Sequence, residues 1–209
     1  MREAFGITNI YTLDNPIDCS GIVEKAYEYE PANIDPSFFH FVMVGRLSHE
    51  KGHIRALRAF SRLNNDTPCK LVIIGEGQER NSLESFVKSS NLEDSVYFTG
   101  HLSNPYPYIR CANAMIQPSF IESFGLTILE AMLLRIPVVT TDTIGGIRVT
   151  DKGKFGILVD YSEDGIFYGL ENVLNNQNYS SERIESAYNW SLSFDLSQFK
   201  NKLIHLLEQ

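Results

Sequence analysis

Short apolar runs alternate with segments of helical periodicity along the middle of this chain, and that alternation restricts the fold more than any other feature. The apolar runs are four to six residues long, and we expect strands at residues 39–44, 70–75, 95–100, 114–117, 136–141 and 156–159. Between them we expect helices at residues 54–63, 80–88 and 125–134, and a short helical or irregular stretch at 105–111. Strands that alternate with helices build a parallel sheet covered on both faces. The sequence therefore predicts an α/β fold with a Rossmann-like open parallel sheet.

The two ends of the chain lack this alternation. Residues 1–38 carry scattered polar residues and three prolines, and we interpret them as a lead-in rather than a domain. Residues 163–209 show no strong strand pattern and are predicted to be helical. We therefore divide the chain into a lead-in over residues 1–38, a sheet domain over residues 39–175 and a helical tail over residues 176–209.

Composition excludes several classes of protein. The chain has 209 residues, of which 43% are hydrophobic and 21% charged, as in a globular domain with one core. Its net charge of −8 provides no basic field to recruit nucleic acid. Cys19, Cys69 and Cys111 are odd in number and far apart, which favours a reducing cytoplasm over a disulfide framework. No apolar run reaches the length of a transmembrane helix, and the N-terminus has no signal-peptide pattern.

The first candidate binding segment follows the first predicted strand. Gly45 lets the backbone approach a ligand closely, Arg46 can fork onto phosphate oxygens, and Lys51 can add a point charge. Gly52 then opens a helix whose N-terminus favours anions. The alternative interpretation is a surface turn with two solvated cations. Because parallel strands bind ligands at their carboxyl ends, groups that follow different strands are expected to meet at one edge of the sheet.

Two patterns resemble motifs of other protein classes. Residues 49–53 match the zinc signature H-E-x-x-H, but Gly52 interrupts them in a strand-to-helix turn, where the two histidines cannot share one face of a helix. The dyad Asp-x-Asp, which commonly binds a divalent metal in one large class of sugar transferases, does not occur, so we expect no metal. Residues 75–77 begin a dinucleotide fingerprint that lacks its third glycine, because position 80 is Arg80, and we interpret them as a tight strand-to-helix turn near the binding edge. Gly145 and Gly146 are interpreted as a flexible loop.

Two carboxylates eight residues apart form the second candidate segment. Gly125 marks the predicted start of a helix, which places Glu130 inside the helix and Glu122 in the preceding loop. The backbone N–H groups near Gly125 can hold a phosphate. Glu130 lies among apolar residues, where a carboxylate needs polar partners, and ribose hydroxyls would serve. The alternative is an exposed helical glutamate and an unrelated loop glutamate.

These segments, in this order, resemble the C-terminal domain of the retaining glycosyltransferases of family 4, which have the two-domain GT-B fold. The resemblance extends over residues 12–175. Its segments are residues 15–18, 44–47, 51–52, 71–77, 96–100, 118–132 and 137–139. It implies that the sheet is the C-terminal half of a GT-B fold and that residues 15–18 correspond to the linker into that half.

The resemblance also implies a role for each candidate residue in binding a nucleotide-diphospho-sugar, the sugar donor. Arg46 and Lys51 would bind the diphosphate, Glu130 would bind the ribose, and Glu122 would contact the transferred sugar. Two further groups would contact the phosphate and the base, respectively: the backbone of Phe124, Gly125 and Leu126, and the segment of Gly100, His101 and Leu102. A UDP-sugar is the expected donor, with a GDP-sugar as the alternative. No cofactor and no metal are implied, because cations and helix N-termini would neutralise the leaving group.

The acceptor site of the family belongs to an N-terminal domain for which this chain has no room. The resemblance therefore implies that the full-length enzyme transfers a sugar with retention to a glycan or lipid-linked acceptor, in the synthesis of a surface polysaccharide such as capsule or lipopolysaccharide. The expected location is the cytoplasm, and peripheral contact with the inner face of the membrane stays open. This chain alone is expected to be inactive.

Two other functions remain as alternatives. One is a non-catalytic nucleotide-sugar-binding subunit, which a gene for a separate acceptor domain would distinguish. The other is a nucleotide-sugar epimerase of the same fold, which product analysis without an acceptor would reveal. A Rossmann dehydrogenase is disfavoured by the missing third glycine at Arg80.

Overall fold

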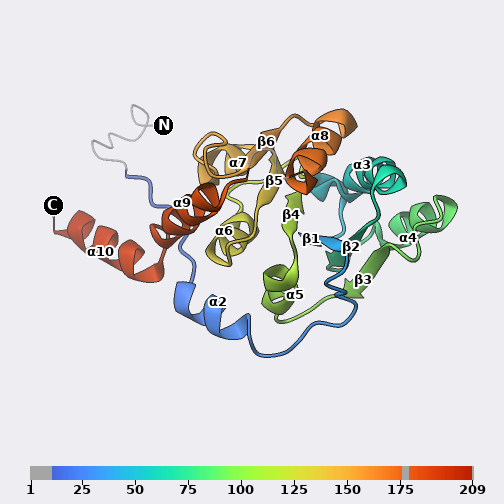
Figure 1. Cartoon of the computed structure of the whole chain (residues 1–209). Helices are drawn as coiled ribbons and strands as arrows, with labels where there is room; N and C mark the ends of the chain where they lie inside the picture. Colours follow the sequence, from blue (N-terminus) through green and yellow to red (C-terminus); the bar gives the residue numbers. More distant parts are fainter. Residues whose placement is uncertain (1–10, 176–178, 209) are drawn as a thin grey trace.

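A six-stranded sheet forms the centre of the molecule in a computed structural model, which describes residues 11–175 and 179–208. The spatial order is β3-β2-β1-β4-β5-β6, and every neighbouring pair is parallel (Figure 1). The strands are β1 (Phe39–Val44), β2 (Cys69–Ile74), β3 (Val96–Gly100), β4 (Ala114–Gln117), β5 (Val138–Thr141) and β6 (Ile157–Val159). The order reverses between β1 and β4, and ligands bind at such a switch point in open parallel sheets. The predicted Rossmann-like fold is confirmed.

Helices cover both faces of this sheet (Figure 1). The connections between strands contain α3 (His53–Asp66), α4 (Arg80–Ser89), α5 (Tyr106–Cys111), α6 (Leu126–Leu133) and α7 (Ile144–Val149). After β6 come α8 (Glu163–Leu174), α9 (Ser181–Leu192) and α10 (Leu196–Leu207). The predicted helices at residues 54–63, 80–88 and 125–134 are confirmed, and the stretch at 105–111 is helical.

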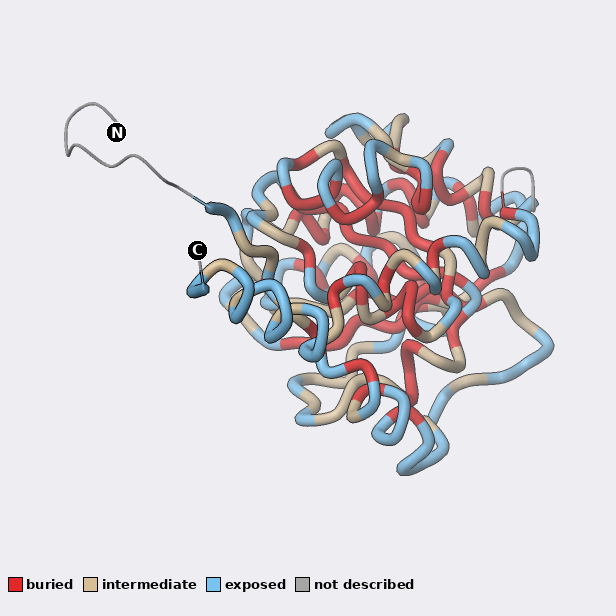
Figure 2. Tube along the Cα trace, turned by 90° about the vertical axis from the view of Figure 1, so that its left-hand side faces the viewer, coloured by how far each residue is buried: buried red, intermediate tan, exposed pale blue. Residues whose placement is uncertain are grey.

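Two separate hydrophobic clusters explain the two layers. Because side chains alternate along a strand, Phe41 and Met43 of β1 point into a cluster with α3, α4 and α8. Val42, between them, points into the opposite cluster with α5 and α6. All three side chains are at most 1% exposed, so the strand is buried on both faces, as expected for a parallel sheet. Figure 2 shows this buried centre within a mostly exposed outer layer.

One helix lies where none was predicted, and one expectation about a loop is wrong. The lead-in contains a helix, α2 (Cys19–Lys25), which packs against α5 and α6 and begins where the Asp18 carboxylate accepts from the Gly21 N–H. Gly145 and Gly146, expected as a flexible loop, lie in α7. A Cβ on Gly145 would stand 2.8 Å from the Glu122 carbonyl oxygen, and one on Gly146 would stand 2.4 Å from the Thr141 carbonyl oxygen. Close backbone packing, rather than flexibility, explains these glycines.

The lead-in contacts the C-terminal part of the chain. Ile17 forms a parallel bridge with Asp195, just before α10, and α9 packs on α6. None of the residues in α10 is buried, and this helix projects from the body (Figures 1 and 2). The expected helical tail is confirmed as α9 and α10. The predicted boundary at residue 176 and the first ten residues lie outside the described residues, and the division into domains stays a prediction.

Within residues 11–175 and 179–208, no helix is both long enough and apolar enough to cross a membrane. Cys19, Cys69 and Cys111 are all unpaired.

Candidate functional site

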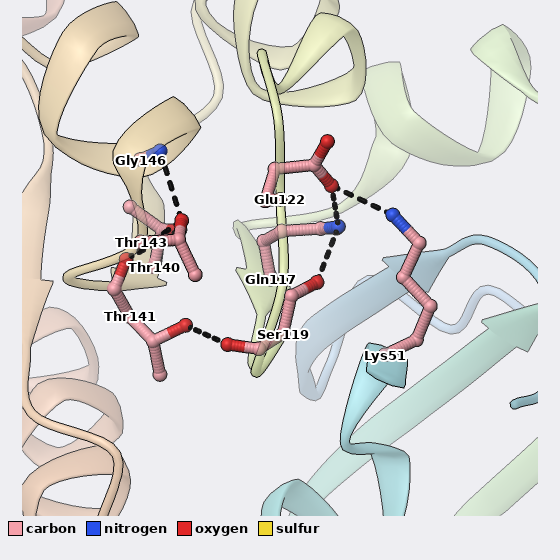
Figure 3. Close-up of polar contacts among 8 residues, drawn as sticks. All are labelled: Lys51, Gln117, Ser119, Glu122, Thr140, Thr141, Thr143 and Gly146. Carbon is pink, nitrogen blue, oxygen red and sulfur yellow. Dashed lines mark hydrogen bonds and ion pairs between the residues drawn. The ribbon is translucent and has the colours of Figure 1, made fainter. Parts of the chain in front are cut away.

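An ion pair joins the two candidate segments at the switch point of the sheet. Lys51 ends the short 3-10 helix η1 (His49–Lys51) after β1, and Glu122 lies in the loop between β4 and α6. The Lys51 Nζ atom stands 2.7 Å from Glu122 Oε2, with the two side chains 24% and 13% exposed (Figure 3). Two side chains that are 71 residues apart in sequence are therefore in contact, at the edge where the sequence predicts a site.

Close backbone contact holds these two segments together. Gly52 has a left-handed conformation (φ 67°), and a Cβ there would stand 2.3 Å from the Pro118 carbonyl oxygen. The Phe120 N–H also donates to the Glu50 carbonyl oxygen at 2.8 Å. The turn before α3 and the loop after β4 thus form one unit, which fixes where Lys51 can meet Glu122.

Gln117, the last residue of β4, is a site residue that the sequence analysis missed. Its side chain is 3% exposed. Its Nε2 atom donates to Glu122 Oε2 and to Ser119 Oγ, both at 3.1 Å (Figure 3). The Thr141 hydroxyl of β5 in turn donates to the Ser119 carbonyl oxygen at 2.5 Å. A polar residue at the end of an otherwise apolar buried strand was the available signal, because buried polar groups need partners.

Arg55 is a second residue that the sequence analysis missed. It lies on α3, is 7% exposed, and donates to the carbonyl oxygens of Pro118 and Tyr161. Its guanidinium carbon stands 3.4 Å from the centroid of the Phe120 ring. Burial lowers the pKa of this guanidinium from its usual value. Arg55 therefore anchors the loop after β4 through its contacts with Pro118 and Phe120, in the same region as the ion pair.

The N-terminus of α6 provides the predicted backbone donors. Gly125 is its N-cap, with a left-handed conformation (φ 92°), and no side chain caps the helix. The sequence prediction that the helix starts here is confirmed. The N–H groups of Phe124, Gly125 and Leu126 therefore have no capping side chain and can bind an anion or water.

Glu130 lies inside α6, as expected, and has a partner in α5. The Tyr106 hydroxyl donates to Glu130 Oε1 at 3.3 Å. Burial raises the pKa of Glu130, and the hydrogen bond from Tyr106 opposes that shift without cancelling it. Burial also raises the pKa of Tyr106 to about 12, so the phenol keeps its proton at neutral pH. Glu130 is thus a half-buried carboxylate with spare acceptor capacity.

A cavity of about 420 Å³ lies beside the ion pair. Its wall contains Gly45, Arg46, His101 and Leu102, four of the predicted site residues, together with Gly75 and Glu76. Gly100 ends β3 at the same edge. The Lys51 Cδ atom stands 3.9 Å from where a Cβ on Gly45 would lie, which connects this cavity with the Lys51–Glu122 pair. Arg46 is exposed, and no acidic side chain among the described residues pairs with it.

The zinc-like motif has the geometry that argues against a zinc site. His49 lies in η1 and stacks on Phe120, with ring centroids 5.1 Å apart, whereas His53 is buried in the first turn of α3. Gly52 separates the two in its left-handed conformation. In the described part of the chain, no three His, Cys, Asp or Glu side chains gather as a metal site. The absence of a metal requirement stays a prediction.

The sequence of this chain matches a known protein family. The family described as Glycosyl transferases group 1 matches residues 28–190. An uncharacterized glycosyltransferase of Methanocaldococcus jannaschii is 32% identical over 181 residues, which are 78% of this chain and 44% of that protein. The N-acetylgalactosamine-N,N'-diacetylbacillosaminyl-diphospho-undecaprenol 4-alpha-N-acetylgalactosaminyltransferase of Campylobacter jejuni is 33% identical over 178 residues, or 84% of this chain and 46% of that protein. The chain therefore spans about half the length of these curated relatives.

Solved structures show the same fold. A glycosyltransferase from Rickettsia africae superposes with a TM-score of 0.81 at 16% identity, covering 94% of this chain and 56% of that one. HepE from Anabaena, in complex with UDP and glucose, superposes with a TM-score of 0.78 at 19% identity, covering 93% and 55%. These neighbours are GT-B glycosyltransferases, so the fold of this chain is that of one half of a GT-B protein. With the family match extending over most of its length, the chain belongs to the group 1 glycosyl transferases.

Proposed function

We propose that this chain is the donor-binding half of a glycosyltransferase that uses a nucleotide-diphospho-sugar. The observation that carries the proposal is the Lys51–Glu122 pair beside the cavity that Arg46 lines, at the carboxyl ends of the strands. Two cations and the uncapped start of α6 suit a diphosphate. The carboxylates of Glu122 and Glu130 suit the hydroxyl groups of a sugar and a ribose.

The proposed arrangement assigns one part of the donor to each group. Arg46, Lys51 and the backbone N–H groups of residues 124–126 bind the diphosphate, and Glu130 binds the ribose. Glu122 contacts the transferred sugar, and residues 100–102 face the base. Charge on the leaving diphosphate is neutralised by fixed cations and helix amides, a task that requires neither metal nor cofactor. UDP is the proposed nucleotide and GDP the alternative.

The relatives support the class of reaction. The Campylobacter jejuni relative is named for an acceptor linked to diphospho-undecaprenol, and HepE was solved with UDP and glucose. By analogy we propose transfer with retention to a glycan or lipid-linked acceptor, in the synthesis of a surface polysaccharide. A lipid-linked acceptor would bring the full enzyme to the inner face of the membrane.

We further propose that residues 1–209 bind the donor without transferring its sugar. Transfer requires an acceptor hydroxyl held against the reacting carbon, and that positioning supplies about 7–11 kcal/mol of the barrier. It also requires a site closed to water. The groups that we assign to the donor all lie on one edge of one sheet. The opposite side of a closed site would be formed by the other half of a protein as long as the relatives.

A thermal-shift panel of nucleosides, nucleoside diphosphates and their sugars tests the proposal. A ligand at 100 times its dissociation constant would stabilise the chain by about 2.7 kcal/mol. We expect the largest shift with a UDP-sugar, and at most slow hydrolysis in a product assay. No shift with any nucleotide would contradict the proposal. Conversion of the sugar without an acceptor would indicate an epimerase, and robust transfer by a monomer would refute the half-enzyme interpretation.

A further inference from the structure

We propose that Gln117 is a positioning residue that holds the Glu122 carboxylate in place when the donor diphosphate draws Lys51 away. The inference rests on the proposed function and goes beyond it, because it assigns a specific task to a buried amide that contacts no part of the donor. Gln117 would act only through Glu122.

The chemistry of the Glu122 carboxylate determines which end of the Gln117 amide faces it. An ionised carboxylate can only accept hydrogen bonds, so the amide must present its NH₂ group. That group reaches both Glu122 Oε2 and Ser119 Oγ at 3.1 Å from a strand whose residues are all buried. Buried polar contacts of this kind are rigid, because an unpaired amide at the same position would be costly.

Both donors to the carboxylate use the same oxygen. Lys51 Nζ and Gln117 Nε2 each contact Oε2 of Glu122, and no described residue donates to Oε1. Figure 3 shows Oε1 pointing away from Lys51 and Gln117. One oxygen is therefore occupied in holding the side chain, and the other is left to accept from a sugar hydroxyl.

The backbone of Glu122 is fixed independently of its side chain. The Gly145 N–H of α7 donates to the Glu122 carbonyl oxygen at 2.8 Å. A Cβ on Gly145 would stand 2.7 Å from the Phe124 carbonyl carbon, so α7 lies directly against this loop. Among the described residues, only Lys51 and Gln117 make a hydrogen bond or an ion pair with the Glu122 side chain.

Binding of the nucleotide-sugar affects the two restraints on Glu122 differently. Lys51 is a flexible cation that we assign to the diphosphate, so an anionic ligand competes with Glu122 for it. Gln117 is a neutral amide below the carboxylate, and a diphosphate has no advantage over Glu122 in binding it. When Lys51 moves to the phosphate, the hydrogen bond from Gln117 still orients Glu122 toward the sugar.

The test is a double-mutant cycle with Gln117→Leu and Glu122→Ala, because alanine leaves no acceptor for the Gln117 NH₂ group. Leucine has a similar size and suits an apolar strand, so Gln117→Leu removes the donor with little change in volume. Titration calorimetry measures the affinity for UDP, for UDP-glucose and for UDP-N-acetylglucosamine, and the readout is the gain that the sugar adds over UDP. Thr141→Val is the matched control, because it breaks a buried hydrogen bond to Ser119 in the same network without touching Glu122.

We expect Gln117→Leu to leave the affinity for UDP unchanged and to reduce the sugar-dependent gain about tenfold, the effect of one charge-assisted hydrogen bond. The double variant should bind UDP-sugars no more weakly than Glu122→Ala alone, because residues that act as a unit are not additive. Thr141→Val should keep the gain. Equal losses for UDP and the UDP-sugars, full additivity with Glu122→Ala, or the same loss in Thr141→Val would each overturn the proposal.

Crystal structures of Lys51→Ala and of the double variant Lys51→Ala Gln117→Leu, both without nucleotide, separate this inference from the proposed function. Because Lys51→Ala removes the ion pair, Gln117 should keep the Glu122 side chain near its present position in that variant. In the double variant we expect Glu122 to leave that position or to occupy several rotamers. The same position of Glu122 in both variants would overturn the positioning role even if UDP-sugars bind. If no UDP-sugar binds the wild-type chain, the proposed function fails, and displacement of Glu122 in the double variant alone would still support the positioning role.

Discussion

Lys51 Nζ lies 2.7 Å from Glu122 Oε2, so the cation assigned to the diphosphate is neutralised by the carboxylate assigned to the sugar. Both side chains are partly buried, and removal of one partner would leave the other charge without compensation. Arg46 differs, because none of the ion pairs found among the described residues includes it. The two cations of the proposed phosphate site should therefore respond differently to substitution.

Arg46→Ala and Lys51→Ala should each weaken the binding of a nucleoside diphosphate and barely affect the free nucleoside. Each lost charge-assisted contact corresponds to about 1.5–3 kcal/mol. Lys51→Ala should lie at the upper end, because it also leaves Glu122 as an unpaired negative charge near the phosphates. Titration calorimetry with uridine, UMP and UDP measures the difference.

Arg62→Ala provides the control for this pair of variants, since Arg62 is a cation of α3 that is paired with Asp164 on the surface. It should leave UDP affinity unchanged. Equal losses of uridine and UDP affinity in Arg46→Ala or Lys51→Ala would show that these residues do not bind the phosphates.

Glu130→Gln should make the chain more stable at neutral pH and a weaker binder of nucleotides. Burial raises the pKa of Glu130, so the folded chain binds this proton more tightly than the unfolded chain. The resulting stabilisation is full below the unfolded pKa and is lost as pH rises through the folded pKa. The variant should therefore gain unfolding free energy at pH 8 and show little difference near pH 4, in urea titrations. Weaker acceptance from ribose hydroxyls should lower UDP affinity about tenfold.

The exposed Glu93 offers a matched control, because its carboxylate forms no hydrogen bond or ion pair with any described residue. Glu93→Gln should change neither the free energy of unfolding nor the affinity for UDP. If Glu130→Gln binds UDP as the wild type does and only melts at a lower temperature, Glu130 has a structural role.

His53 should contribute an acid-sensitive term to stability. Burial, with a smaller effect of Lys51, lowers its pKa from 6.5 to about 4, so the unfolded chain binds this proton first. The stability it supports is complete above pH 6.5 and falls as pH drops toward 4, by about 3 kcal/mol. Urea titrations between pH 4 and 7.5 should show this slope in the wild type and a shallower one in His53→Leu. An unchanged slope would contradict the assignment, and His101→Asn, at an exposed site, should keep the slope of the wild type.

EDTA should not alter the affinity for UDP. The proposed site neutralises the diphosphate with Arg46, Lys51 and helix amides, and the two histidines of the zinc-like motif lie on opposite sides of Gly52. Calorimetry before and after dialysis against EDTA measures the effect. Stoichiometric zinc that survives dialysis and disappears in His49→Ala would overturn this prediction.

Periodicity in the sequence was sufficient to predict the sheet. Each strand is a short apolar run, and the alternation of Phe41, Val42 and Met43 between two helical layers is the expected result of burial on both faces. The start of α6 at Gly125 was also predictable, because a glycine before an apolar helical segment suits a left-handed cap. Local rules determine such features.

The missed features depend on contacts between segments that are distant in sequence. Gln117 and Arg55 acquire their roles only when β4, α3 and the loop at residues 118–122 meet in space. Gly145 and Gly146 look like a loop because two glycines disfavour a helix, yet Gly145 packs against the loop of Glu122 and Gly146 against the Thr141 carbonyl oxygen. Helix α2 was missed because seven residues between prolines carry little periodic signal.

A crystal structure of the chain with UDP-glucose or UDP-N-acetylglucosamine tests the central claim most directly. The proposed function predicts diphosphate oxygens within about 3 Å of Lys51 Nζ and of the Arg46 guanidinium, with the ribose on Glu130 and the sugar at Glu122. A second cavity, of about 460 Å³, lies at the amino ends of the strands and is lined by Asp35, His40 and Lys70. A nucleotide bound there, or anywhere away from Lys51 and Glu122, would contradict the claim.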